Sequence, residues 1–303
     1  MSLKVMFSFI FVITVIVSLM VYWFVPTETI EFGLNDGNYN FSRYSYGLED
    51  MQFYNNMRYP QHTISYKISN CSLQKQNDMV GAFKVLESET ILEFYPVEFG
   101  EEIFVSCEDR DRFKGGLFIA GEGGPTNITR AGNLNVILNG KILLIRQSQC
   151  PTPNVALHEL LHALGFEHST NKNNIMYKYS DCKQTLGEDI PKLINELYVL
   201  ASEPDLIFEN VTATMHGKYL DLNATIRNNG FNVAGNSVME IYADGNLIKE
   251  VNLNSINIGY GRIIILEKVF VFKMNVEKLE LFIKSDFPEL DKQNNRVVLN
   301  VKK

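Results

Sequence analysis

Hydrophobic and polar positions follow three different patterns along the 303-residue chain. Residues 5–25 form an apolar run without a single charged residue. Between residues 63 and 200, stretches with the helical period of about 3.6 residues are mixed with short alternating stretches, which indicates both helices and strands. From residue 205 onward, only short alternating segments separated by turn residues are present. The pattern predicts an α+β domain followed by an all-β domain.

Two helices of the middle part have clear signals. Phe83 and Leu86 lie on the apolar face of a helix predicted at 73–90. A second predicted helix has Thr152 as its N-cap and Pro153 at its first helical position. The other elements expected there are a helix at 189–200, strands at 63–68, 91–95, 102–107, 133–138 and 141–146, a glycine-rich loop at 115–132 and a turn at Asn139-Gly140.

The last part of the chain has the pattern of a β-sandwich. A change of composition at 201–204 indicates a linker, so the sandwich is assigned to 205–303. Roughly seven strands in about 100 residues are typical of an immunoglobulin-like sandwich. A hairpin turn is indicated at Asp244-Gly245. The predicted strand segments are 206–215, 219–228, 238–253, 263–272, 279–286 and 296–301.

The apolar run at the N-terminus has the length of a membrane span. About 20 apolar residues cross a bilayer core, whereas the apolar region of a signal peptide is usually about 7–15 residues long. The run ends in Tyr22, Trp23 and Phe24, which are typical of a membrane interface. We expect a signal anchor at 1–26 with a lipid bilayer as its partner, followed by a stalk or short pro-segment at 27–57. A cleaved signal peptide is the alternative.

This topology predicts a single-pass membrane protein whose N-terminus is cytoplasmic and whose two domains are extracytoplasmic.

Composition and charge exclude one class of partner. The chain is 46% hydrophobic and 21% charged, as globular proteins are. Its 28 Lys and Arg against 35 Asp and Glu give a net charge of −7, and no basic run is present. This balance argues against nucleic acid as a partner.

The four cysteines are Cys71, Cys107, Cys150 and Cys182. None of them forms a C-x-x-C pair, which argues against a zinc ribbon. In an oxidising compartment, an even number of such cysteines predicts two disulfides. Four cysteines allow three pairings, and the spacing alone leaves all of them open.

The segment 158–168 carries the most specific chemical signal. Its pattern is H-E-x-x-H-x-x-G-x-x-H, and three of the chain's five histidines lie in it. His158 and His162 are four residues apart, so on a helix they share one face and can bind one metal ion. Gly165 can adopt the positive φ that ends a helix, which lets the chain fold back and bring in His168 as a third nitrogen ligand.

The ligand set indicates catalysis. Three protein ligands on zinc leave a fourth position for water, which is typical of a catalytic site and not of a structural one. The metal would lower the pKa of that water and polarise a substrate carbonyl. Glu159 lies on the histidine side of the predicted helix, where it is placed to take the proton of the water as general base. The sequence therefore predicts one catalytic Zn²⁺ and a hydrolytic reaction.

The long motif also resembles that of a known group of enzymes. Together with Met176 and Tyr177 in the following Asn-Ile-Met-Tyr stretch, it resembles the metzincin metalloproteases, which have a methionine turn near the zinc site. Within that clan the chain is most similar to the matrixins. Ser169 directly after the third histidine and the order of predicted elements before the motif also match, over residues 58–200.

The resemblance implies a role for each matching residue. The three histidines would bind zinc, Glu159 would be the general base, and Met176 would form the floor of the site. Tyr177 would help to form the wall of the pocket for the side chain after the scissile bond. The strand at 133–138 would be the sheet edge along which a peptide substrate pairs. The glycine-rich loop could also bind Ca²⁺, although Glu122 is its one carboxylate.

A matrixin-like fold favours one disulfide pairing. It places Cys71, at the start of the long helix, near Cys107, at the end of the neighbouring strand. Cys150 precedes the active-site helix and Cys182 follows the methionine turn, so a bridge between them would clamp the two segments around the zinc. We therefore expect the pairs Cys71–Cys107 and Cys150–Cys182.

The C-terminal domain resembles the CARDB-type adhesion sandwich. The resemblance rests on three short segments in the same order, at 204–206, 224–230 and 290–295. It implies a cell-surface or spacer module with a surface partner that the sequence does not identify, and it assigns no catalytic residues.

The sequence as a whole predicts a membrane-anchored zinc endopeptidase that hydrolyses extracytoplasmic proteins or peptides. The alternative is a cell-surface adhesion or binding protein built on a protease-like domain that has lost its activity. Such a loss usually removes the base or a metal ligand, and all four of these residues are present here. For this reason we favour the enzyme.

Overall fold

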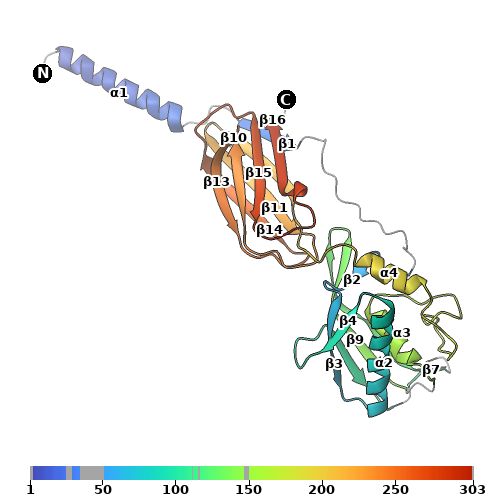
Figure 1. Ribbon diagram of the computed structural model, residues 1–303. Helices are drawn as coiled ribbons and strands as arrows, with labels where there is room; N and C mark the ends of the chain where they lie inside the picture. The colour runs from blue at the N-terminus through green and yellow to red at the C-terminus, as the bar shows by residue number, and fades with distance from the viewer. Residues whose placement is uncertain are drawn as a thin grey trace. The chain divides into compact units, whose positions relative to one another are not determined.

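The computed structural model describes residues 3–24, 29–34, 51–110, 112–114, 117–146 and 150–301. The chain divides into two compact units; Figure 1 colours the chain by residue number. The mixed unit comprises residues 41–204 and 229–233. The sandwich unit comprises residues 1–40, 205–228 and 234–303.

The mixed unit is built on a six-stranded sheet. Its strand order is β2-β9-β5-β3-β4. β2 pairs with the start of β9 and β5 with its end, whereas β8 pairs with β9 along its whole length, on the opposite edge. All neighbouring pairs are parallel except β8 with β9, which is antiparallel. The strands are β2 (Met57–Arg58), β3 (Thr63–Ser69), β4 (Glu93–Pro96), β5 (Ile103–Cys107), β8 (Gly121–Ala131) and β9 (Leu134–Leu144), with a separate hairpin of β6 (Arg112–Lys114) and β7 (Leu117–Ile119).

Three helices complete the mixed unit: α2 (Leu73–Glu89), α3 (Asn154–Ala163) and α4 (Asp189–Leu197). Phe83 and Leu86 of α2 are buried, which confirms the apolar face predicted for this helix. Helix α3 starts one residue later than expected, and α4 is shorter than expected. All three helices share one hydrophobic core with the sheet, and α2 and α3 lie side by side (Figure 1).

Most of the glycine-rich segment forms strand β8 instead of the predicted loop. β8 and β9 form a hairpin whose turn is at Gly132, with φ 59°, and Asn133. The predicted turn at Asn139-Gly140 is wrong, because both residues lie inside β9. Gly140 is needed there for close packing: an added Cβ would lie 2.4 Å from the Tyr59 hydroxyl oxygen. The segment of β8 is polar and glycine-rich, so it lacks the alternation by which strands are recognised.

The assignment of 27–57 to a stalk or short pro-segment outside the two domains is wrong at both of its ends. β1 (Thr29–Leu34) is a strand of the sandwich unit and pairs with β10 and β16. Residues 51–57 belong to the mixed unit, where Met57 is fully buried and the Phe53 N–H donates to the Gly165 carbonyl at 2.9 Å. These segments are held by backbone pairing and tertiary contacts, which leave no periodic pattern in the sequence. The stalk prediction for 35–50 lies outside the described residues.

The sandwich unit is an antiparallel eight-stranded sheet with the order β13-β12-β15-β16-β1-β10-β11-β14. Alternate residues of its strands form a second hydrophobic core, as in β11, where Leu220 and Leu222 are buried. Asp244 and Gly245 form the predicted hairpin turn. The remaining elements are β10 (Leu206–His216), β11 (Tyr219–Asn228), β12 (Ser237–Ala243), β13 (Asn246–Leu253), β14 (Gly261–Phe270), β15 (Lys278–Ser285), β16 (Arg296–Val301) and the 3₁₀ helix η1 (Gln293–Asn295).

The N-terminal apolar run forms helix α1 (Leu3–Phe24). In the part of the chain that the structure describes, no helix meets the combined length and apolarity that a membrane crossing requires. The membrane-spanning segment expected at 1–26 is therefore not found among these residues.

Candidate metal centre

Helix α3 places His158 and His162 next to each other. Their rings lie edge to face, with centroids 4.6 Å apart. Leu157, Leu160 and Leu161 of the same helix are buried in the core of the mixed unit. These leucines fix the rotation of the helix about its axis, and the two histidines are presented together on one face.

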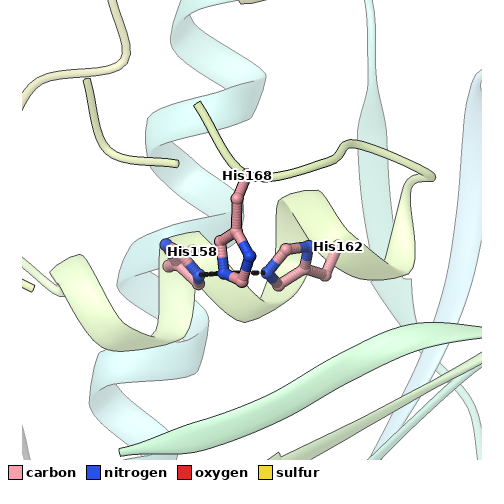
Figure 2. A group of neighbouring side chains, drawn as sticks. All are labelled: His158, His162 and His168. Atoms are coloured by element: carbon pink, nitrogen blue, oxygen red, sulfur yellow. Dashed lines mark hydrogen bonds between the residues drawn. The ribbon is translucent and has the colours of Figure 1, made fainter. Parts of the chain in front are cut away.

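The chain reverses at Gly165 after α3. Figure 2 shows His168 next to the other two histidines. Gly165 has a φ of 96°, and an added Cβ would lie 2.5 Å from the Met57 sulfur, so only glycine fits this turn. The Nε2 atom of His168 lies 3.3 Å from that of His158 and 3.2 Å from that of His162. The three predicted ligands therefore converge on one point.

The two helical histidines present their Nε2 atoms in the neutral form. Nδ1 of His158 lies 2.7 Å from the Ile175 carbonyl oxygen, and Nδ1 of His162 lies 2.7 Å from that of Phe166. A carbonyl only accepts hydrogen bonds, so each Nδ1 carries the proton and each Nε2 keeps its lone pair. Burial lowers the pKa of His158, and burial together with the neighbouring His158 lowers the pKa of His162 to about 4.

The donor set fits zinc. Tetrahedral zinc with Zn–N bonds of about 2.0–2.1 Å separates its nitrogen ligands by about 3.3 Å. The two close Nε2 separations of 3.2 and 3.3 Å match this spacing. Among the described residues, the histidines are the one group of three or more His, Cys, Asp or Glu side chains that could hold a metal. Glu122, the carboxylate considered for Ca²⁺, instead contacts Arg112 at 3.4 Å, so calcium binding has no support there.

Glu159, between the two helical histidines in sequence, is buried against β8, and only 6% of it is exposed. Burial raises the pKa of its carboxyl to about 8, and the charge of Glu122 acts in the same direction. The Gly123 N–H donates a hydrogen bond to the carboxylate, which opposes the shift. A carboxyl group in such surroundings can both accept and release a proton near neutral pH.

The Met176 segment is tied to the histidines by main-chain hydrogen bonds. The Ile175 carbonyl contacts His158, and the Ser169 N–H donates to the Met176 carbonyl at 2.8 Å. The Met176 N–H donates to Oδ1 of Asn174 at 2.8 Å, which holds the turn. The Met176 side chain is buried in the core that also contains α3. Its role as the floor of the site stays a prediction.

Tyr177, the expected pocket residue, is half-buried at the end of this turn. Its ring contacts that of Tyr179 edge to face, with centroids 5.7 Å apart. The Lys178 ammonium lies 4.9 Å from the centroid of the Tyr179 ring. The structure therefore gives Tyr177 an aromatic neighbour, and its role in a substrate pocket stays a prediction.

Both disulfides have the expected pairing. Cys71 is bonded to Cys107, and Cys150 is bonded to Cys182. The first joins the start of α2 to the end of β5, and the second joins the segment before α3 to the segment after Met176.

The sheet edge next to the metal centre differs from the prediction. The strand expected at 133–138 is part of β9, which lies between β8 on one side and β5 and β2 on the other. Among the described residues, β8 pairs only with β9, so β8 is the edge strand. The error has the same cause as the missed hairpin: the polar, glycine-rich sequence of β8 does not look like a strand.

Two contacts of the site had no clear signal in the sequence. Phe53 stacks on His162, with ring centroids 5.9 Å apart and an interplanar angle of 24°. It lies in a polar segment without periodicity, so sequence reasoning assigned it to the stalk. Gly121 and Gly123 of β8 contact Glu159 directly. A glycine-rich stretch before the motif was visible, but its contact partner was not.

Comparison with known proteins gives one family for each unit. The Matrixin family model (Peptidase_M10) matches residues 58–199, and the CARDB model matches residues 203–297. Residues 58–199 therefore match the matrixins and residues 203–297 match the CARDB family, as the motifs indicated. Because matrixins are metalloproteases, the first match supports a metalloprotease at the family level.

Two solved structures are similar to a part of this chain. The CARDB domain of the PF1109 protein from Pyrococcus furiosus, solved in complex with di-metal ions, is 16% identical; the match covers 33% of this chain and 87% of that one, with a TM-score of 0.28. A domain of a Methanosarcina acetivorans protein, solved by NMR, is 14% identical; that match covers 33% of this chain and 93% of the other, with a TM-score of 0.28. No curated protein matches the chain.

Proposed function

We propose that the chain is a zinc-dependent endopeptidase that hydrolyses peptide bonds of extracytoplasmic proteins. One observation carries the proposal: three histidine nitrogens converge, and the residue that follows the first of these histidines is a buried glutamate. Three nitrogen ligands leave zinc a position for the reacting groups. The residues that would act are His158, His162 and His168 as ligands and Glu159 as general base.

The three histidines would hold the metal through Nε2, and two of them are oriented by main-chain carbonyls at Nδ1. When bound, zinc supplies a Lewis acid that polarises the scissile carbonyl and acidifies water. Glu159 takes a proton from the attacking water at its carboxylate and passes it to the nitrogen of the leaving amine. Met176 would support the site from the core, and Tyr177 would line the pocket after the scissile bond.

A peptide substrate would pair with the free edge of β8. An edge strand offers main-chain N–H and C=O groups to which an extended peptide can add as a further strand. The N-terminal end of β8 contacts Glu159 through Gly121 and Gly123. A peptide bound along this edge would therefore pass next to the proposed base.

We further propose that the protein works outside the cytoplasm. All four cysteines are paired in two disulfides, which persist in oxidising compartments. The CARDB domain would then act as a spacer or adhesion module beside the protease domain.

The test is cleavage of a mixed peptide library by the purified full chain. A zinc-loaded sample, a chelated sample and the Glu159→Ala variant are compared, and zinc content is measured for each. We expect one zinc per chain and cleavage that stops on chelation and returns with zinc. Glu159→Ala is expected to keep its zinc and to lose at least about 100-fold in rate, because proton transfer by the base is lost.

A second variant, His158→Ala, is expected to lose both zinc and cleavage. Folded, zinc-loaded protein that cuts no peptide would contradict the proposal. It would favour the alternative of a binding protein built on a protease domain without activity.

A further inference from the structure

Two glycines of β8 lie so close to Glu159 that no side chain fits at either position. A Cβ added at Gly121 would lie 2.6 Å from Cγ of Glu159 and 2.9 Å from its Oε1. A Cβ added at Gly123 would lie 2.2 Å from the main-chain oxygen of Glu159. Real Cβ atoms essentially never show contacts this short, so any other residue would displace the glutamate or the strand.

Backbone conformation does not explain these glycines. Neither Gly121 nor Gly123 has a positive φ, so other residues could adopt the same backbone. Gly124, the next residue of the strand, also has an ordinary φ, and an added Cβ there would meet nothing within 4 Å. The requirement for glycine at the first two positions therefore comes from contact with Glu159, whereas Gly124 has no such contact.

We propose that Gly121 and Gly123 are positioning residues for the general base, an inference that rests on the proposed function. Without Cβ atoms, β8 lies directly on the start of the Glu159 side chain and on its main chain. The Gly123 N–H donates to the carboxylate, which fixes the orientation of the group that accepts the proton. The strand that would bind the peptide and the base that acts on it are thereby held at one fixed separation.

The two positions are expected to respond differently to alanine. At Gly121 the added methyl group meets the glutamate side chain, which can rotate away, so the fold and the zinc ligands stay intact. We expect Gly121→Ala to lower kcat by about 10- to 100-fold, because small misplacement of a catalytic group has effects of this size. KM and zinc content should stay within about twofold of the wild type. At Gly123 the methyl group meets main chain, so the strand itself must move.

Gly124→Ala in the full chain is the matched control, because the change is the same in the same strand. It should keep the wild-type Tm and zinc content, because its added methyl group meets nothing within 4 Å. If Gly121→Ala keeps the wild-type kcat while wild-type protein cleaves peptides, the positioning role is overturned and the proposed function stands. If zinc-loaded wild-type protein cleaves nothing, the proposed function fails, and the positioning role fails with it.

A second measurement uses metal-free protein and no activity. Gly121→Ala should lower Tm by a few degrees in the wild-type background, because the methyl group overlaps the Glu159 side chain. In the Glu159→Ala background, where Cγ and the carboxylate are absent, the same change should leave Tm unaltered. Gly123→Ala should lower Tm in both backgrounds, because it meets main chain. Equal Tm losses for Gly121→Ala in the two backgrounds would show that the Glu159 side chain is not what it contacts.

Discussion

The disulfide partners Cys150 and Cys182, with Cα atoms 5.1 Å apart, connect the segment before α3 to the segment after the Met176 turn. The Cys71–Cys107 disulfide closes a loop of similar length that contains none of the three histidines, with a sequence separation of 36 against 32. We predict that replacing either pair by serine lowers the free energy of unfolding by about 3–4 kcal/mol, because loop closure entropy depends on loop length.

Zinc affinity should separate the two disulfides. Only loss of Cys150–Cys182 frees both segments that hold the metal site, so we expect about 10-fold weaker zinc binding for that variant alone. The measurements are urea unfolding of the chelated proteins and zinc titration of each variant. Equal zinc affinities would mean that the core, and not the disulfide, holds the ligands.

Gly140 and Tyr59 form a close contact that can be tested as a pair. Tyr59 is fully buried, and its hydroxyl donates to the Ala163 carbonyl at 3.3 Å. A Cβ at position 140 would lie 2.4 Å from the hydroxyl oxygen, so Gly140→Ala should cost about 2–3 kcal/mol of stability. Adding Tyr59→Phe removes that oxygen and should recover part of the loss. Urea unfolding of the single and double variants checks this, and a double variant less stable than Gly140→Ala would contradict it.

Arg58 is a buried arginine whose planar guanidinium group donates hydrogen bonds at its edge and stacks on aromatic rings with its faces. Its Nη1 donates to the Leu197 carbonyl at 2.6 Å, and its guanidinium carbon lies 3.6 Å from the ring centroid of Phe231 and 4.6 Å from that of Tyr198. Lysine has no planar group, so it cannot donate these hydrogen bonds and stack on the rings at the same time. We predict that Arg58→Lys lowers the unfolding free energy by about 2–4 kcal/mol.

The matched control is Arg130→Lys, which changes an exposed arginine and should cost less than about 0.5 kcal/mol. Thermal unfolding of the two variants and the wild type is sufficient. A loss at Arg58→Lys no larger than that at Arg130→Lys would mean that charge and bulk alone account for the buried position.

Asp205 should make the unfolding free energy of the sandwich unit decrease as pH rises from about 4 to about 6. Burial raises its pKa to about 6 from the ordinary 3.8, against hydrogen bonds from Asn294 and the Asp291 N–H that lower it. The folded state therefore keeps a proton that the unfolded state has already lost, and the unfolding free energy decreases as pH rises through this window. The effect is at most about 3 kcal/mol, because one pKa unit corresponds to about 1.4 kcal/mol.

Asp205→Asn should remove this decrease, which urea unfolding between pH 3.5 and 7 would measure in steps of about half a unit. Asp244→Asn is a control of opposite sign. Burial acts to raise the pKa of Asp244, but Lys273 and two main-chain N–H groups together lower it. Its contribution to stability is therefore present above the ordinary pKa and lost as pH falls. Unchanged pH dependence in Asp205→Asn would assign the transition to another group.

The metal centre could be predicted from sequence because its geometry is local. His158 and His162 are placed by the period of one helix, and His168 by a glycine that reverses the chain. Both disulfides could be predicted once the matrixin resemblance supplied a fold. Contacts within a short segment depend on few neighbours, and for this reason a spacing rule was sufficient.

The edge of the site could not be predicted in the same way. β8 is a strand because β9 pairs with it along its length, not because its polar, glycine-rich sequence favours extended structure. Phe53 reaches His162 only through the tertiary packing of residues 51–57. The contacts of Gly121 and Gly123 with Glu159 join elements that are distant in sequence, and a single sequence does not show which glycine has a close neighbour.

β1 has a consequence for how the sandwich unit can be produced as a fragment. This strand lies between β16 and β10, and it precedes the whole mixed unit in the chain. In chain order, the mixed unit is thus inserted into the sandwich unit. A fragment that starts at residue 203 lacks β1, so it leaves the facing edges of β10 and β16 unpaired and open to self-association. A soluble sandwich fragment should therefore need residues 29–34, either fused to it or added as a separate peptide.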